Sequence, residues 1–534
     1  MIKRFSSYNW IVLLTGLTFL VWWSGLAGSQ LYWAPTLILL IYSLYRIRKG
    51  SFNEVVIDSV GLFFSWVTSS SGLKWIKILF LTHGGIWVGV NILKFYSFSY
   101  SLHDVGWYSN EFFNISQGEF YSSIINAHSF ANHFTPSMAF LGLLYKITPS
   151  VHWMMVCKTL SFLASPIVIY LIGKELFTEK EKALKVSIGL SFVWFFFYRP
   201  IVNSVRFDFS PSSLAPVFIF LAFLYLLKEK WGRFFIIMVF LLGMKVNVAT
   251  VWIGFGLYLV LAGRRKKLGV ALTIAGILAI YLILFQITPY FRDYAELFDK
   301  IDRVNLFVDI PGKAYYLFKL LLPLGFIPLI FWKNGIMAAP AIGINLISGY
   351  AKMYSSHYHY DDVAAPLLFI AVIVSLREFN LFEVWSNLLS KKYGKGIFIF
   401  WCLFFLHLLP YSSLRFLKGA IPNKDELATG REVIHFESIS RGKQVAVQDV
   451  LAPHFFRKEI AGFQQGADCS KENTFLQGEL PHPYPPYEYI VLAPGLSNYR
   501  IRNMKQCLRD LENAPEFEKL DQYKYLAIFK KIKS

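Results

Sequence analysis

The 534-residue sequence is 55% hydrophobic and 18% aromatic, and 16% of its residues are charged, well below the roughly 25% of a soluble globular protein. Lys and Arg outnumber Asp and Glu by 53 to 34, which gives a formal net charge of +19. The basic residues fall in short clusters between apolar runs, as the positive-inside rule expects, so the charge does not indicate nucleic acid as a partner. Composition therefore excludes a soluble globular protein and indicates a chain that lies mostly in membrane lipid.

About thirteen segments are candidate membrane spans, since a span needs about 20 mostly apolar residues, or fewer where protein covers it. We expect them near 10–27, 31–45, 75–96, 151–173, 183–198, 211–227, 233–247, 248–262, 267–288, 315–332, 335–350, 363–376 and 396–413. No small-residue cleavage site separates the first segment from the second, so we expect an uncleaved span there. The predicted fold class is an all-α polytopic membrane protein with a small C-terminal α/β extracytoplasmic domain.

The basic clusters predict which loops are cytoplasmic. They are Lys3/Arg4, Arg46/Arg48/Lys49, Lys180/Lys182/Lys185, Lys228/Lys230/Arg233, Arg264/Arg265/Lys266/Lys267 and Lys391/Lys392/Lys395. All of these clusters lie on the cytoplasmic side only if the apolar segment 134–149, which contains Pro136 and Pro149, stays on the outer face without crossing the membrane. The N-terminus is then cytoplasmic and the C-terminal domain lies outside.

Three parts follow from this pattern. Residues 1–74 hold two transmembrane helices and a cytoplasmic loop, residues 75–413 form the transmembrane core with a large outer loop at 97–150, and residues 414–534 form a soluble domain. The soluble part is rich in charge, Pro and Gly, and its short apolar runs at 444–447 and 489–492 are typical of strands.

Two of the four cysteines, Cys469 and Cys507, fall in the soluble part, while Cys157 and Cys402 fall in expected spans. An oxidising outer compartment permits a disulfide between the first two. Connectivity does not follow from sequence, so two free thiols are the alternative.

Asp104 follows the third expected span and opens the large outer loop. A partly buried carboxylate at this depth can act as a general base or a metal ligand, because burial raises its pKa. The alternative is a helix N-cap, since loop Asp residues commonly accept backbone N–H bonds. Further along the loop, His133 precedes Pro136 and could ligate a metal or anchor the interface.

Polar residues also lie at the ends of later spans. Lys245 and Asn247 sit inside an apolar hairpin, where an ionisable group is costly and normally faces a partner or a polar cavity. A phosphate or Asp208 is a suitable partner for Lys245, and Arg206 lies close to Asp208 in sequence. These residues predict a binding site at the outer face.

The segment 354–362 combines histidines, tyrosines and two aspartates. Its candidate binding residues are His357, Tyr358 and His359. With the carboxylates that follow they could bind a metal or a phosphate, whereas the Tyr repeats are equally typical of an ordinary interfacial loop. The sequence contains no P-loop, no dinucleotide-binding glycine pattern, no His-Glu-x-x-His and no Cys-x-x-Cys, so catalysis would depend on residues from several spans.

The order of these features resembles domain-of-unknown-function family 2079 of bacterial membrane proteins, which is similar to the GT-C-type glycosyltransferases. The matching elements are the Asp104 loop, His133-Phe134-Thr135-Pro136 leading to Leu144-Tyr145, Phe207-Asp208-Phe209, the Lys245 hairpin with Arg264/Arg265, the stretch Tyr358 to Pro366, and the tail from Val445 through Tyr489-Ile490-Val491-Leu492. The likeness extends over most of the chain, from about 80 to 530.

The resemblance implies a membrane transferase of the bacterial plasma membrane that uses a polyprenyl-phosphate-linked sugar as donor, with Asp104 as catalytic base. The chain departs from the family at Ser210 and Ser212, and at Val246 and Asn247, where the family usually has His or acidic residues. A divalent metal cofactor is therefore left open.

Three hypotheses remain at this point. The first is a glycosyltransferase acting on the outer face, in which basic groups such as Lys245, Arg206 and Arg199 hold the phosphate leaving group. The second is a transporter or flippase-like carrier, in which Lys245 marks a substrate path. The third is a non-catalytic membrane scaffold. We favour the enzyme, because the two halves show no inverted repeat and an outer soluble domain is unusual for a carrier.

Overall fold

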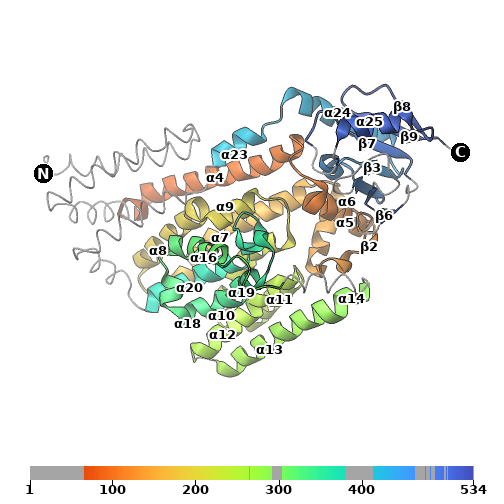
Figure 1. Ribbon diagram of the computed structural model, residues 1–534. Coiled ribbons are helices and arrows are strands. Elements are labelled where there is room, and N and C mark those ends of the chain that lie inside the picture. Colours follow the sequence, from red (N-terminus) through yellow and green to blue (C-terminus); the bar gives the residue numbers. More distant parts are fainter. Residues whose placement is uncertain are drawn as a thin grey trace, which may run out of the picture.

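The structure is a computed structural model of the chain (Figure 1). It describes residues 65–263, 265–291, 304–378, 413–463, 475–476, 481–482, 487–497, 501 and 503–532. The expected spans 10–27 and 31–45, and 396–413 up to residue 412, lie outside the described residues. So do Cys402 and Cys469.

Three helices of the described part are long and apolar enough to cross a membrane. They are α4 (Ser70–Tyr96), α7 (His152–Leu176) and the run Lys266–Phe291, which comprises α13 (Lys266–Leu282), the π turn η7 (Ile283–Ile287) and α14 (Thr288–Phe291). A fourth span is formed if α8 (Lys180–Phe192) with η4 (Val193–Phe197) is counted together with α9 (Arg199–Arg206), although this pair bends by 53°.

The remaining helices of the core are shorter. They are α10 (Ala215–Leu227), α11 (Trp231–Leu242), α12 (Thr250–Leu261), α16 (Ile310–Leu321), α17 (Ile327–Ile330), α18 (Trp332–Gly335), α19 (Ala339–Ile347) and α20 (Ala364–Glu378). Short 3₁₀ turns, among them η5 (Pro211–Leu214), η6 (Val246–Ala249) and η9 (Ile336–Ala338), lead into several of them. The mostly helical membrane fold is confirmed, while the number of about thirteen spans stays a prediction.

The expected span 315–332 is not one continuous helix, and whether it crosses the membrane stays a prediction. Helix α16 ends at Leu321, and α17 begins only at Ile327. Between them Gly325 and Phe326 adopt left-handed backbone angles, with φ of +61° and +56°. Pro323 in the short turn η8 (Leu322–Leu324) has no amide N–H to continue the helix, so an apolar run does not become one helix here.

The surface of α13 identifies a lipid-facing side. Val270, Ile274, Ile277, Leu278 and Tyr281 are 48–59% exposed. Their spacing places them on one face of the helix, and a contiguous exposed apolar face of this kind suits hydrocarbon. We therefore assign this face of α13 to the bilayer.

The centre of the core is α20. Residues 364–375 of this helix are all buried, as expected for a helix that is apolar all round. Its N-terminal end follows the 3₁₀ turn η11 (His359–Asp361) directly. The fold therefore carries the candidate segment 357–362 into the interior of the helical bundle.

The large outer loop is compact. It contains α5 (Trp107–Ser116), a two-stranded hairpin of β1 (Tyr121–Ser122) and β2 (Ala127–His128), the turns η2 (Ser129–Ala131) and η3 (Pro136–Met138), and α6 (Ala139–Ile147). The helical stretch Pro136–Ile147 spans about 18 Å at roughly 1.5 Å per residue, which is less than the roughly 30 Å of a hydrocarbon core. Its expected position on the outer face remains a prediction.

The C-terminal part is an α/β domain, as expected (Figure 1). Its seven-stranded sheet has the order β6-β5-β4-β3-β7-β9-β8, and β3 pairs in parallel with both β4 and β7. The strands are β3 (Val445–Val447), β4 (Ile460–Phe463), β5 (Phe475–Leu476), β6 (Pro481–His482), β7 (Tyr489–Leu492), β8 (Phe517–Leu520) and β9 (Ala527–Lys531), with helices α24 (Lys424–Ile439) and α25 (Met504–Asn513). The two predicted strands correspond to β3 and β7, which are direct neighbours. Helix α23 (Ser413–Ala420) lies along α4 before this domain begins.

Cys507 of α25 is buried and disulfide-bonded. Since Cys469 is outside the described residues, the pairing of these two cysteines stays a prediction. Cys157 of α7 is a free thiol.

Candidate functional site

Asp104 occupies a strained turn beyond the C-terminal end of α4. The turn η1 (Leu102–Gly106) is wide, and within it Asp104 has φ of +60° and ψ of −78°. These angles lie near those of a rare γ-turn, and non-glycine residues held there store strain that tends to mark functional sites. The N-cap of the following helix α5 is Gly106, without any side-chain capping bond. The alternative that Asp104 caps this helix is therefore wrong.

The Asp104 carboxyl is surrounded by charges from several segments. Its pKa is raised to about 7, first by burial and then by the Asp208 charge, while the Lys245 and Lys352 charges lower it. The side chain nonetheless keeps partial solvent access. A carboxyl that is half ionised near neutral pH, next to two lysines and reachable from outside, is suited to accept a proton from a bound substrate.

Asp208 lies just after α9 and is neutralised by a residue that the sequence analysis missed. Lys94, near the end of α4, forms a 3.0 Å ion pair with Asp208 Oδ1, and its ammonium group also donates to the Arg206 carbonyl at 3.0 Å. The fully buried Lys158 of α7 donates to the Phe207 carbonyl at 2.6 Å. These two lysines fix the 206–208 segment against α4 and α7.

Lys245 is located in the connection between α11 and α12. Its backbone is extended, with φ of −172° and ψ of 150°, and it precedes the turn η6. The Lys245 charge acts on Asp104, His359 and Asp362. Asn247, two residues on, has a buried side-chain oxygen without a hydrogen-bond partner among the described residues. The Lys245 charge therefore influences both the Asp104 carboxyl and the segment that precedes α20.

The buried end of the candidate segment contains His359, Asp361 and Asp362. Neither ring nitrogen of His359 has a hydrogen-bond partner among the described residues, and burial together with Lys245 and Lys158 lowers its pKa well below its usual value. Burial raises the pKa of Asp362 to about 8. Its neighbour Asp361 accepts a 2.7 Å hydrogen bond from the Tyr316 hydroxyl.

The exposed end of the same segment contains His357 and Tyr358. His357 is exposed, and its pKa is lowered by burial first and then by the Arg199, Lys319 and Arg206 charges. The Tyr358 ring lies 5.4 Å from the Lys352 ammonium group, in a cation–π contact. The predicted patch is thus divided, because His359 is buried near Lys245 whereas His357 is exposed near Arg199.

Two other predicted binding residues are Arg206 and His133. The Arg206 guanidinium stacks on the Phe416 ring of α23, with 4.9 Å to the ring centre. The His133 carbonyl accepts a 3.4 Å hydrogen bond from Thr135 Oγ1. Binding roles for these two residues stay predictions.

Glu111 is a second buried carboxyl of the outer loop, and the sequence analysis did not select it. It lies on α5, is 2% exposed, and its Oε1 has no hydrogen-bond partner among the described residues. Burial raises its pKa to about 8, while Ser129 and Thr135 act in the opposite direction. The sequence signal for Glu111 was that it is the single carboxylate within α5.

We expect Glu111 to make stability depend on pH. Its folded-state pKa of about 8 lies above its ordinary value of 4.5. The stability that protonated Glu111 contributes is therefore fully present below about pH 4.5 and is lost as the pH rises through 8. The Glu111→Gln variant should therefore lose less thermal stability than the wild type between pH 5 and about 9. Glu119→Gln, at a half-exposed position of the same loop, serves as control and should follow the wild type. Parallel melting curves for Glu111→Gln and the wild type across this range would contradict the expectation.

The described residues contain no group of three or more His, Cys, Asp or Glu side chains arranged to hold a metal ion. The candidate residues that lie closest to Lys245 combine acids with cations, a mixture that suits an anionic ligand better than a divalent cation.

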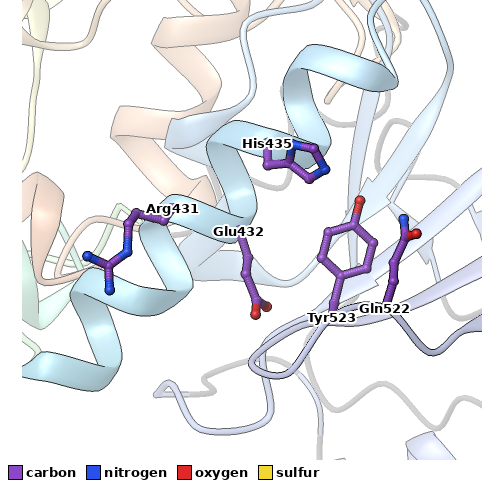
Figure 2. A pocket seen from close by; sticks show the side chains of 5 residues that line it. All are labelled: Arg431, Glu432, His435, Gln522 and Tyr523. Carbon is purple, nitrogen blue, oxygen red and sulfur yellow. The ribbon is translucent and has the colours of Figure 1, made fainter.

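Two cavities lie on the C-terminal domain, and Asp104 lines neither. One, of about 290 Å³, is lined by Arg431, Glu432, His435, Gln522 and Tyr523 (Figure 2). There Glu432 accepts the backbone N–H groups of residues 524–526 at 2.8–3.0 Å, so this carboxylate ties α24 to the loop before β9. The second cavity, of about 490 Å³, lies between the end of α4 and α24.

Comparison with solved structures identifies a protein of similar fold. The crystal structure of ArnT from Cupriavidus metallidurans, bound to undecaprenyl phosphate, matches with a TM-score of 0.51 and 12% sequence identity. The match covers 87% of this chain and 99% of that chain. At this level of identity the likeness shows a shared fold, and it agrees with the GT-C-type fold that the sequence resembles. No curated protein matches the sequence.

The model of one protein family matches residues 94–459, which is more than half of the chain and includes every candidate site residue. The family is described as predicted membrane protein, DUF2079. The resemblance noted from the ordered motifs is thereby confirmed, and this chain belongs to the DUF2079 family of predicted membrane proteins.

Proposed function

We propose that the protein is a membrane glycosyltransferase that transfers a sugar from a polyprenyl-phosphate-linked donor to an acceptor on the outer face of the bacterial plasma membrane. The observation that carries this proposal is the strained, partly accessible Asp104 carboxyl, whose pKa the Lys245 and Lys352 charges lower. The fold shared with ArnT, a protein crystallised with undecaprenyl phosphate, supports a polyprenyl-linked lipid as the partner.

In the proposed reaction Asp104 is the general base. The acceptor hydroxyl or amine gives its proton to the carboxylate while its oxygen or nitrogen bonds to the anomeric carbon of the donor sugar. The anomeric carbon–oxygen bond to the phosphate breaks, and both bonding electrons leave on the phosphate oxygen. The products are the glycosylated acceptor and polyprenyl phosphate, and the configuration at the anomeric carbon is inverted.

The leaving phosphate gains negative charge in this step, so nearby cations lower the barrier. Lys245 and Lys352 are the cations that act on Asp104, and either would lie within reach of a phosphate bound next to it. Asp208 is already paired with Lys94. The proposed phosphate ligands are therefore Lys245 and Lys352, with His359 as a buried donor without a partner among the described residues.

The rate of transfer should depend on pH through Asp104. A general base must be ionised, so kcat/KM is expected to rise with pH and to level off above about 7, which is the pKa of this carboxyl. Lys245→Met removes a cation that lowers this pKa, so the acidic limb of the profile should move to higher pH. Lys146→Met, at an exposed position of α6, is the control and should leave the profile unchanged. An acidic limb that stays in place in Lys245→Met would contradict the assignment of Asp104 as the base.

The proposal is tested by reconstituting the full chain in liposomes with radiolabelled sugars linked to polyprenyl phosphate. Release of free polyprenyl phosphate together with labelled acceptor is the expected result. Movement of the labelled lipid across the bilayer without bond cleavage would instead identify a flippase-like carrier. Neither cleavage nor movement with any donor and acceptor of a broad panel would favour the scaffold.

A further inference from the structure

The 3₁₀ turn η12 (Asp449–His454) of the C-terminal domain contacts the Asp104 turn. This segment follows β3 and is fixed to the sheet by Gln448. The Gln448 amide N–H donates to the Val491 carbonyl at 3.0 Å, and its side-chain oxygen accepts from Ala493 N–H at 2.8 Å. These two hydrogen bonds hold the start of the turn against the sheet.

Asp449 makes the polar contact to the catalytic turn. Its Oδ1 accepts the backbone N–H of Leu102 at 3.2 Å, and the Asp449 side chain is 2% exposed. Leu102 is the first residue of η1 and lies two residues before Asp104. A hydrogen bond from a backbone N–H to a buried carboxylate is among the stronger hydrogen bonds in proteins, so it fixes where the strained turn begins.

Close packing adds contacts at both ends of the turn, at Gly106 and at Leu102. A Cβ atom placed on Gly106 would lie 3.0 Å from the Ala452 Cβ atom, and one placed on Gly462 would lie 2.1 Å from a methyl carbon of Leu102. The His454 ring is stacked between Phe95 and Phe98, with ring centres 4.0 and 4.3 Å apart. Residues of the C-terminal domain therefore contact the turn both before and after Asp104.

We propose that η12 of the C-terminal domain holds the Asp104 turn in its strained shape and that Asp449 is the positioning residue for the catalytic carboxylate. The proposal rests on the function proposed above only for the role of Asp104 in catalysis. An isolated residue at φ of +60° would relax to a commoner conformation unless its surroundings prevented this. The contacts that do so come from a domain more than 300 residues further along the chain.

The first test measures hydrogen exchange in the full-length protein. Asp449→Leu removes the acceptor of the Leu102 amide, so exchange in the segment 101–107 should accelerate about tenfold or more, as expected for the loss of a hydrogen bond to a charged group. Asp449→Asn keeps a side-chain oxygen at this place and should retain most of the protection. Unchanged exchange in Asp449→Leu, or equal acceleration in both variants, would overturn the proposal.

The second test is a pair of compensating substitutions. Gly106 has helical backbone angles, so Gly106→Ala meets no conformational penalty. Its added Cβ atom would lie 3.0 Å from the Ala452 Cβ atom and 3.2 Å from the Ser101 carbonyl oxygen, and Ala452→Gly relieves the first of these contacts. We expect Gly106→Ala to lower kcat with little change in KM, and Ala452→Gly in the same chain to restore it. Failure of Ala452→Gly to restore either kcat or the exchange pattern would count against the contact.

The two tests separate this inference from the proposed function. If hydrogen exchange responds as expected but no donor is cleaved by the wild type, η12 positions the turn and the assigned reaction is wrong. If the wild type is active and Asp449→Leu exchanges and reacts like it, the reaction stands and the positioning role is wrong.

Discussion

Asp104→Asn is expected to lower the rate of sugar transfer by about two to four orders of magnitude, the usual contribution of a general base. The substitution keeps the size and hydrogen-bonding shape of the side chain and removes its basicity. Asn also tolerates positive φ better than most residues do, so the turn at φ of +60° should keep its shape. Transfer in liposomes and thermal stability should be measured on the same preparation.

Asp309→Asn is a matched control. Asp309 is also an aspartate with positive φ, at +51°, but its side chain caps α16 by accepting the Gly312 N–H. Asn and Asp cap helices about equally well, so this variant should keep both its stability and its activity. An Asp104→Asn protein that is as active as Asp309→Asn would exclude the catalytic role of Asp104 and favour the carrier or the scaffold.

Long apolar helices and alternating strands were predictable from the sequence because their signals are local. The expected span 75–96 falls within α4, and 151–173 begins one residue before α7 and ends inside it. The runs at 444–447 and 489–492 contain β3 and β7. Apolar length alone did not reveal where an apolar segment breaks. The interruption after Leu321 depends on left-handed residues and on a proline, which hydropathy does not register.

Site residues were predictable from the sequence where an ionisable residue lies in or next to an apolar segment, as Asp104 and Lys245 do. Lys158 met the same criterion, because it is an ionisable residue in an expected span. Its ammonium group donates to the backbone carbonyls of Phe207 and Asp208. Asp449 offered no such signal. Its contact with Leu102 joins residues 347 positions apart, and the identity of an acidic residue in a soluble domain does not reveal which amide it will accept.

Arg457, just beyond η12, is expected to carry a large share of the stability of the C-terminal domain. It is 4% exposed, and its guanidinium donates to the Glu437 carboxylate, to the Ser440 carbonyl at 3.2 Å and to the Lys443 carbonyl at 2.8 Å. Arg457→Met leaves a mostly buried carboxylate without its cation and two carbonyls without their donor. Breaking a buried pair in this way costs about 3–5 kcal/mol.

The neighbouring ion pair supplies the control, since Lys458 bonds Glu119 at 2.7 Å with both side chains about half exposed. Lys458→Met should therefore lower the free energy of unfolding by about 1 kcal/mol or less. Chemical unfolding, monitored by hydrogen exchange in α24, would compare the two variants directly. The backbone carbonyls of Arg457 and Lys458 also accept hydrogen bonds from Asn110 of α5, at 3.0 and 3.1 Å. Arg457→Met should therefore accelerate hydrogen exchange in α5 as well. Equal effects of Arg457→Met and Lys458→Met on the free energy of unfolding would mean that the buried pair contributes no more than the exposed one.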